Sequence, residues 1–192
     1  MKNIRRMIIG CLGMILAVSL PAFAQIAEPV QGAGSFLNGY WILNNVWTTS
    51  IVLLNPTGKD RDAIVLFYDD EERFLTCDVR RLTPHDMEIV RFPVLFRDLC
   101  AAFPDTCAGR SLAGFGGHVE IRSEPVDNSG KPGINGYVML IGRGDATSST
   151  SPLFVVDAAL FQIEARDALR IAQCACPRLK TLRSPLEAVF CR

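Results

Sequence analysis

Residues 48–68, TTSIVLLNPTGKDRDAIVLFY, decide the fold of this chain. The stretch opens with Thr48 to Leu54, a run rich in β-branched residues, and closes with a second apolar run, Ala63 to Tyr68. Between them, Asn55-Pro56-Thr57-Gly58 supplies consecutive residues that favour turns. Short apolar runs separated by turn residues predict neighbouring antiparallel β-strands.

The same alternation of strands and turns continues on both sides of this stretch. Further strands are expected at Tyr40–Leu43, Phe74–Val79, Met87–Phe92, His118–Ser123 and Gly136–Ile141. In the fourth of these, Val119 and Ile121 alternate with Glu120 and Arg122, which predicts a strand with one buried face. The spacing predicts a mainly β fold, a single antiparallel β-sandwich.

Some segments depart from the strand pattern. Val94–Pro104 predicts a short helical insertion, whereas the glycine-rich Ser111–Gly117 and the Ser/Thr-rich Thr147–Ser151 predict loops. Residues 153–165 fit a strand or a helix equally well. The following residues favour a helix by propensity, and Pro177 is expected to end it.

The N-terminus has the pattern of a secretory signal peptide, residues 1–24. Basic residues precede an apolar run, Met7 to Leu20, and Ala22-Phe23-Ala24 forms a small-x-small cleavage site. A retained membrane anchor fits less well because the run is short and contains glycine and serine. A lipoprotein signal ending at Cys11 would leave too short an apolar core.

The signal peptide predicts a bacterial exported protein that resides in the periplasm, at the cell surface or outside the cell. The rest of the chain is expected to comprise a lead-in segment, 25–36, a β-sandwich domain, 37–165, and a disulfide-attached C-terminal tail, 166–192. Contact with a membrane is expected only through the signal peptide.

Cysteine content predicts a disulfide framework in an oxidising compartment. Six cysteines remain after the signal peptide: Cys77, Cys100, Cys107, Cys174, Cys176 and Cys191. Cys100 and Cys107 are close enough in sequence to form a local bridge. Cys174 and Cys176 are separated by one residue and cannot bridge each other without strain. We expect them to bond to Cys77 and Cys191, in an order that the sequence leaves open.

The charge distribution argues against nucleic acid as a partner. The signal peptide holds three of the 20 basic residues and none of the 20 acidic ones, so the mature chain has a net charge of −3. Basic residues are nevertheless concentrated at the C-terminal end: Arg166, Arg170, Arg178, Lys180, Arg183 and Arg192, against Asp167 and Glu187. This segment is interpreted as a solvated tail, the alternative being contact with an anionic surface.

Four segments together resemble a recurring bacterial module: Thr49–Thr57, Val65–Asp69, Leu82–Pro84 and Gly117–Ser123. Over residues 47–123 the chain is similar to uncharacterised exported β-sandwich domains, in which a strand ending Asn-Pro-Thr precedes a strand ending Tyr-Asp. The resemblance implies an immunoglobulin-like sandwich in the envelope, often without enzymatic activity. It identifies no catalytic residue.

These observations predict a non-enzymatic envelope module that binds a protein or a surface glycan. Tyr40, Trp41 and Trp47 are the candidate ligand contacts, because exposed aromatic rings stack on sugar rings. No catalytic residue, cofactor or metal site is expected.

Other functions would use different residues. Cys174 and Cys176 would serve a periplasmic thiol-redox or metal-binding protein. A hydrolase would use His85 or His118, with Ser111 in a sequence close to a nucleophile elbow. Calcium would require the carboxylates of residues 69–72 to meet Asp60 and Asp62, and a solvated hairpin is preferred.

Overall fold

The computed structural model describes residues 36–44, 46–91, 100, 101, 104, 115–124, 132–142, 148–156 and 165–191. The predicted signal peptide, Cys107, Ser111 and most of the lead-in segment lie outside these residues. Within the predicted insertion, Cys100, Ala101 and Pro104 are helical and the remainder lies outside the described residues. Among the helices that are described, none has both the length and the apolar character needed to cross a membrane.

The described chain is mainly β, as predicted, and ends in two helices. The strands are β1 Phe36–Leu43, β2 Trp47–Leu54, β3 Arg61–Asp69, β4 Phe74–Leu82, β5 Met87–Arg91, β6 Phe115–Ser123, β7 Asn135–Gly142, β8 Ser148–Pro152 and β9 Phe154–Val156. The helices are α3 Ala165–Leu182 and α4 Glu187–Phe190.

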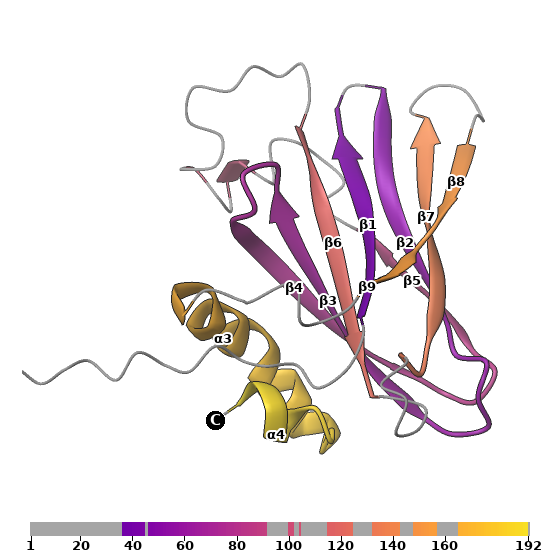
Figure 1. The fold of residues 1–192 in the computed structure, drawn as a ribbon, viewed down its shortest axis with the longest axis vertical. Helices are drawn as coiled ribbons and strands as arrows, with labels where there is room; N and C mark the ends of the chain where they lie inside the picture. Colours follow the sequence, from indigo (N-terminus) through magenta and orange to yellow (C-terminus); the bar gives the residue numbers. More distant parts are fainter. Residues whose placement is uncertain are drawn as a thin grey trace, which may run out of the picture.

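The strands form two antiparallel sheets (Figure 1). The larger sheet has the order β4-β3-β6-β1-β9, and the smaller sheet has the order β5-β2-β7-β8. The larger of the two apolar clusters contains residues from both sheets, among them Trp41, Ile51, Val65, Phe67, Val119 and Val138. The two sheets therefore share one hydrophobic core.

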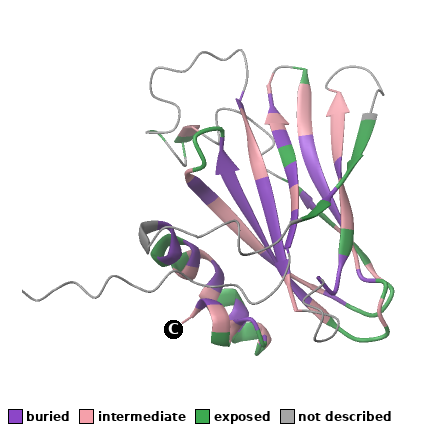
Figure 2. Ribbon diagram, viewed as in Figure 1, coloured by how far each residue is buried: buried purple, intermediate pink, exposed green. Residues whose placement is uncertain are grey.

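Strand β3 is buried on both faces, and Figure 2 shows this burial along the strand. Ala63, Val65 and Phe67 belong to the core shared by the sheets, and the alternate residues Ile64 and Leu66 belong to a second cluster. Because successive side chains of a strand point to opposite faces, only a strand covered on both sides favours an unbroken apolar run. This explains the sequence of residues 63–68.

The second cluster lies between the larger sheet and the C-terminal helices. Ile171, Ala175 and Leu179 of α3 and Phe190 of α4 pack with side chains of β3 and β4. Figure 1 shows α3 and α4 beside β4, away from the smaller sheet. The tail predicted from residue 166 is thus, over residues 165–191, an ordered helical layer.

The prediction that Pro177 ends the helix is wrong. Pro177 lies inside α3, which continues to Leu182. A proline in a helix interior costs about 3 kcal/mol, because it removes a hydrogen bond to the preceding turn. Burial of Ala175 and Leu179 on either side of Pro177, together with disulfides at Cys174 and Cys176, offsets this cost.

Two predicted loops are partly strands. Phe115–Gly117, assigned to a loop because of its glycines, forms the first part of β6 and pairs with β1. Ser148–Pro152, in the predicted Ser/Thr-rich loop, forms β8 at the edge of the smaller sheet. In the ambiguous segment 153–165, Phe154–Val156 is a strand and residues 157–164 lie outside the described residues. Cross-strand pairing thus overrides local composition.

The Asn-Pro-Thr turn after β2 depends on one buried side chain. The Asn55 amide nitrogen donates hydrogen bonds to the carbonyls of Lys59, Leu82 and Thr83, at 2.8, 3.1 and 2.8 Å. Its Oδ1 accepts the Thr57 N–H at 3.0 Å. Asn55 therefore closes its own turn and attaches it to the end of β4, which accounts for an asparagine at this position.

Candidate functional site

The turn between β3 and β4 is organised by Asp69, which is buried at the end of β3. Its Oδ1 accepts hydrogen bonds from the N–H groups of Glu71 and Arg73, at 3.0 and 2.9 Å. Its Oδ2 accepts hydrogen bonds from the Arg73 guanidinium, with Nη2 at 2.7 Å and Nε at 2.8 Å. Asp69 therefore holds the turn and leaves Asp70 and Glu72 at its exposed surface.

A row of aromatic side chains crosses the outer face of the larger sheet beside this turn. Tyr40 of β1 pairs with His118 of β6, and His118 pairs with Tyr68 of β3. The His118 and Tyr68 rings are stacked, with centroids 4.5 Å apart. Burial lowers the pKa of His118, although the carboxylates of Glu72 and Asp69 oppose this shift. A neutral imidazole offers one hydrogen-bond donor and one acceptor.

Trp41 lies on the other face of β1, in the core. Its indole Nε1 donates a hydrogen bond to the carbonyl of Tyr68 at 2.7 Å, and its ring stacks on Phe115 at 6.2 Å between centroids. The indole crosses β6 over Gly117, where a Cβ atom would lie 2.8 Å from Trp41 Nε1 and would also collide with the Tyr68 carbonyl. Gly117 is therefore required by close packing.

Replacement of Gly117 by alanine is expected to destabilise the protein by about 1–3 kcal/mol, the usual cost of overpacking a core. The indole must move, so the tryptophan emission should also change. Gly58→Ala is the matched control, since no atom lies within 4 Å of a Cβ at that position. Equal unfolding midpoints in urea for the two variants would contradict this account of Gly117.

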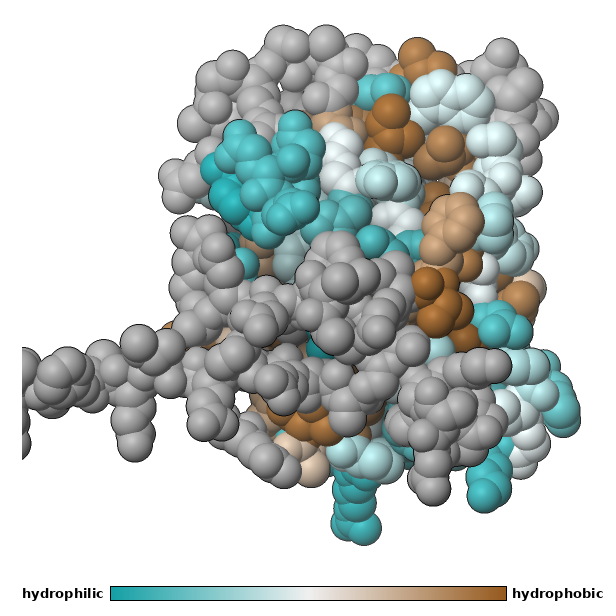
Figure 3. Space-filling view, viewed as in Figure 1, coloured by the Kyte–Doolittle hydropathy of each residue, from teal (hydrophilic) through white to brown (hydrophobic). Residues whose placement is uncertain are grey.

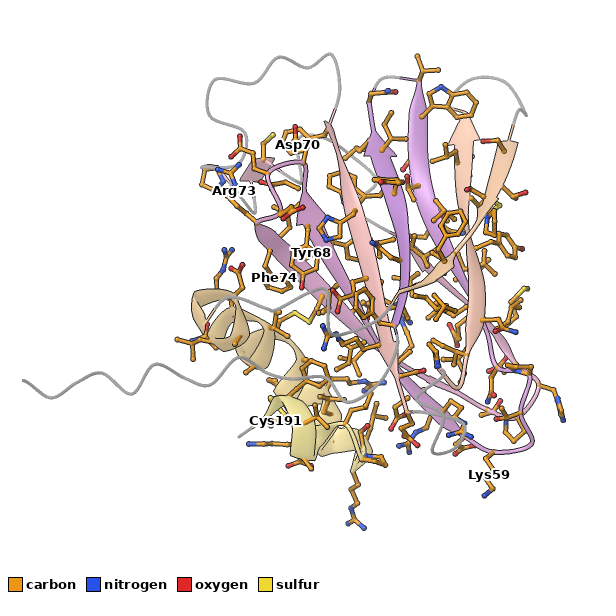
Figure 4. The ribbon with its side chains drawn as sticks, viewed as in Figure 1. Lys59, Tyr68, Asp70, Arg73, Phe74 and Cys191 are labelled. Carbon is orange, nitrogen blue, oxygen red and sulfur yellow. A yellow bond between two sulfur atoms is a disulfide. The ribbon has the colours of Figure 1, made fainter. Side chains whose placement is uncertain are left out.

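A groove of about 720 Å³ opens at this end of the molecule. Its described lining includes Tyr40 and Ile42 from β1, Gly116 and His118 from β6, and Asp70 and Glu72 from the β3–β4 turn. Figure 4 shows Asp70 and Arg73 together at this turn, with Tyr68 and Phe74 beneath it. Tyr40 and Tyr68 lie two strand spacings apart, about 10 Å, with His118 between them.

The three aromatic residues predicted as ligand contacts lie in different environments in the structure. Tyr40 lines the groove and is 79% exposed. Trp41 also lines it, but its side chain is buried and its indole N–H already donates to the carbonyl of Tyr68. Trp47 is half-buried at the start of β2 and is not among the described lining residues. Of the three, Tyr40 is the ring available for stacking.

The prediction that Cys174 and Cys176 bond to Cys77 and Cys191 is confirmed, and the structure gives the order. Cys77 of β4 bonds to Cys174, with Cα atoms 6.1 Å apart, and Cys176 bonds to Cys191, with Cα atoms 5.6 Å apart. These four sulfur atoms are therefore oxidised. The bridges indicate a non-reducing environment. Cys100 is also disulfide-bonded, and its predicted partner Cys107 lies outside the described residues.

The carboxylates weighed as a calcium site do not come together. Asp62 and Asp69 lie at opposite ends of β3, seven residues and about 23 Å apart. Asp62 forms a bidentate ion pair with Arg81, both contacts being 2.8 Å long. Among the described residues, no group of three or more potential metal ligands is present.

The two histidines weighed for a hydrolase occupy different ends of the larger sheet. His85 is exposed in the turn after β4, with a φ angle of 58°, and its N–H donates to the carbonyl of Thr57. His118 lies in the groove at the other end, beside the β3–β4 turn. Ser111, the proposed nucleophile, lies outside the described residues.

Strand β6 was predicted to have one buried face, and this is wrong. Val119 and Ile121 are buried in the shared core, but Glu120 and Arg122 on the opposite face are only 3% and 5% exposed. The Arg122 guanidinium donates from Nε to a carboxylate oxygen of Glu120 and lies 5.2 Å from the Phe36 ring centroid. Charged residues can alternate in sequence and still be buried where they pair with each other.

The sequence predicted Tyr40 as a candidate ligand contact, but it did not predict His118 or Glu72 as its neighbours. These residues come from three separate elements, and only cross-strand register brings them together. The His-Val-Glu-Ile-Arg alternation at residues 118–122 was the available signal, because it places three polar side chains on one face of β6.

Comparisons with known proteins identify no family. No family model matches the chain, and no curated protein matches it. Among solved structures, the chain is similar to the crystal structure of Thermotoga maritima 1070, with 12% sequence identity and a TM-score of 0.39. The match covers 64% of this chain and 94% of the other. A likeness of this extent supports no statement about fold or function.

Proposed function

We propose that this protein is an exported, non-enzymatic envelope module that binds a surface glycan in the groove beside Tyr40. The observation that carries the proposal is the placement of an exposed aromatic ring on the wall of a groove that also holds His118 and exposed carboxylates. An aromatic face stacks on the apolar face of a sugar, and hydroxyl groups bond to imidazole and carboxylate groups.

The proposal also concerns compartment and architecture. Disulfides Cys77–Cys174 and Cys176–Cys191, together with the predicted signal peptide at residues 1–24, support export to the periplasm or cell surface. The core shared by two antiparallel sheets supports a sandwich of the immunoglobulin-like type. Such a scaffold would hold the groove at one end of its sheets.

The lining favours a glycan over a protein partner. Glu72 and Asp70 stand on one wall, Tyr40 on the other, and His118 between them. The described lining contains no lysine or arginine, so an anionic sugar is disfavoured and a neutral one is accepted.

Tyr40→Ala is expected to weaken binding of the cognate neutral oligosaccharide about tenfold, by loss of stacking worth about 1.4 kcal/mol. Phe154→Ala is the matched control, because Phe154 is also exposed, at 57%, and is not among the described lining residues. Isothermal titration against a panel of neutral oligosaccharides measures the change.

Three results would overturn the proposal. One is the absence of binding to any glycan of the panel, and another is equal loss of affinity in both variants. The third is a Tyr40-dependent complex with a protein in place of a sugar. Unfolding midpoints of the two variants must match that of the parent protein, since both side chains are exposed.

A further inference from the structure

The solvent-facing half of the C-terminal helical layer carries unpaired positive charge. Arg170, Arg178, Lys180 and Arg183 are all exposed. Within residues 165–191 there are two acidic residues, of which Asp167 is buried and Glu187 is half-buried. The layer therefore presents four exposed cations and no fully exposed carboxylate among its described residues.

Five of the six described arginines on the sheets and the β3–β4 turn have a carboxylate partner, and the exposed Arg91 of β5 is the exception. The pairs are Arg61–Glu124, Arg73–Asp69, Arg80–Asp78, Arg81–Asp62 and Arg122–Glu120. In contrast, none of the four basic residues of the helical layer pairs with a carboxylate in the described part of the chain. The guanidinium carbon of Arg170 lies over the Phe74 ring, 5.6 Å from its centroid.

These charged residues lie on a helical layer that packing and disulfides hold against the larger sheet. Helix α3 has 18 residues and is about 27 Å long. Its apolar side is buried against β3 and β4, and disulfides join it to β4 and to the residue after α4. A flexible charged tail loses conformational entropy when it binds, whereas this surface is already ordered.

Arg178, Lys180 and Arg183 lie at the C-terminal end of α3, away from the groove, whereas Arg170 packs on Phe74 beside the β3–β4 turn. In Figure 4, Cys191 marks the α3–α4 end and Asp70 marks the groove end. Figure 3 shows hydrophilic side chains at both of these ends, with those near α4 extending away from the body. A surface bound to the helical layer would therefore leave the groove accessible.

We infer that the outer surface of α3 and α4 docks on an anionic lipid bilayer through electrostatic attraction. The apolar side of α3 is committed to the sheet, so the helix attaches without inserting that side into lipid. Leu169, which is 62% exposed beside Arg170, adds apolar contact that a polyanionic sugar would not use.

The test is co-sedimentation of the mature protein with phosphatidylcholine vesicles, with and without one third phosphatidylglycerol. Each basic residue near an anionic surface strengthens attachment about fivefold, so a variant with Arg178, Lys180 and Arg183 all changed to glutamine should bind about a hundredfold more weakly. Binding of the parent protein should fall as salt is raised, because exposed charges are screened.

The matched control is a variant with Lys59→Gln and Arg91→Gln, which removes exposed cations outside the helical layer. Figure 4 shows Lys59 well away from α3 and α4. Equal binding to both kinds of vesicle would overturn the inference, as would equal losses in the two variants. A third outcome would also overturn it. If the parent protein binds heparin but no vesicles, and the triple variant loses the heparin binding, the surface binds an anionic polysaccharide instead.

Discussion

Replacing Cys77 and Cys174 by alanine is expected to lower the free energy of unfolding by about 4–5 kcal/mol, the largest effect of any variant considered. This disulfide joins residues 97 positions apart, so it closes a long loop in the unfolded chain. In the chain-entropy account, stabilisation grows with the logarithm of loop length and reaches about 4.7 kcal/mol for a loop of about 100 residues. Urea unfolding followed by far-ultraviolet circular dichroism measures the loss.

The second disulfide provides the internal control. Cys176 and Cys191 are 15 positions apart, and a loop of that length corresponds to about 3 kcal/mol. Their replacement by alanine should therefore cost about 1–2 kcal/mol less than loss of the first bridge. Equal losses, or the reverse order, would show that the bridges act mainly on the folded state.

Arg122→Met is expected to destabilise the protein by about 3–5 kcal/mol, since it leaves a buried carboxylate without its partner. The guanidinium of Arg122 bonds to Glu120, and its central carbon lies 5.2 Å from the Phe36 ring centroid and 5.9 Å from that of Phe190. Methionine retains much of the packing, so the loss reports the uncompensated charge. Unfolding in urea at neutral pH measures it.

The loss should depend on pH in a defined direction. Burial raises the pKa of Glu120, and Arg122 partly opposes this. Removing Arg122 raises that pKa further, so the folded variant keeps the proton to higher pH than the unfolded chain does. The stabilisation that the protonated Glu120 carboxyl contributes is therefore fully present below the pKa of Glu120 in the unfolded chain. It is lost as the pH rises through the pKa of Glu120 in the folded variant. The deficit should be smaller at about pH 4 than at about pH 7.

A double variant separates the charge from the packing. Glu120→Leu combined with Arg122→Met removes both charges, and apolar replacements of buried ion pairs are often neutral or stabilising. The double variant should recover most of the stability lost in Arg122→Met. If it is as unstable as the single variant, the loss arises from packing of the Arg122 side chain against Phe36 and Phe190.

Much of the β architecture could be predicted from local sequence. The runs Thr48–Leu54 and Ala63–Tyr68, with Asn55 and Pro56 between them, identified β2, β3 and their turn because periodicity and turn chemistry act over a few residues. The expectation that Cys174 and Cys176 bond to other cysteines followed from the strain of a bridge between them, and the structure gave the order of pairing.

Other features depended on contacts between distant segments. Phe115–Gly117 and Ser148–Pro152 became strands because β1 and β7 offered pairing partners, which local composition does not report. Pro177 stayed inside α3 because packing and two disulfides outweighed a local preference. Similarly, the alternation of polar and apolar residues in β6 does not reveal that a helical layer covers one face of the larger sheet.

The candidate site shows the same division. Tyr40 was recognisable by residue type alone, as an aromatic residue at the start of a β domain. His118 and Glu72 are distant from it in sequence and reach the groove through strand register and the Asp69-centred turn. The sequence by itself determined strand periodicity, turns and the oxidised cysteines, because these depend on neighbouring residues or on residue type. Only the tertiary structure decided which polar side chains are buried, which line the groove and which cations remain exposed, because burial and pairing depend on segments far apart in the chain.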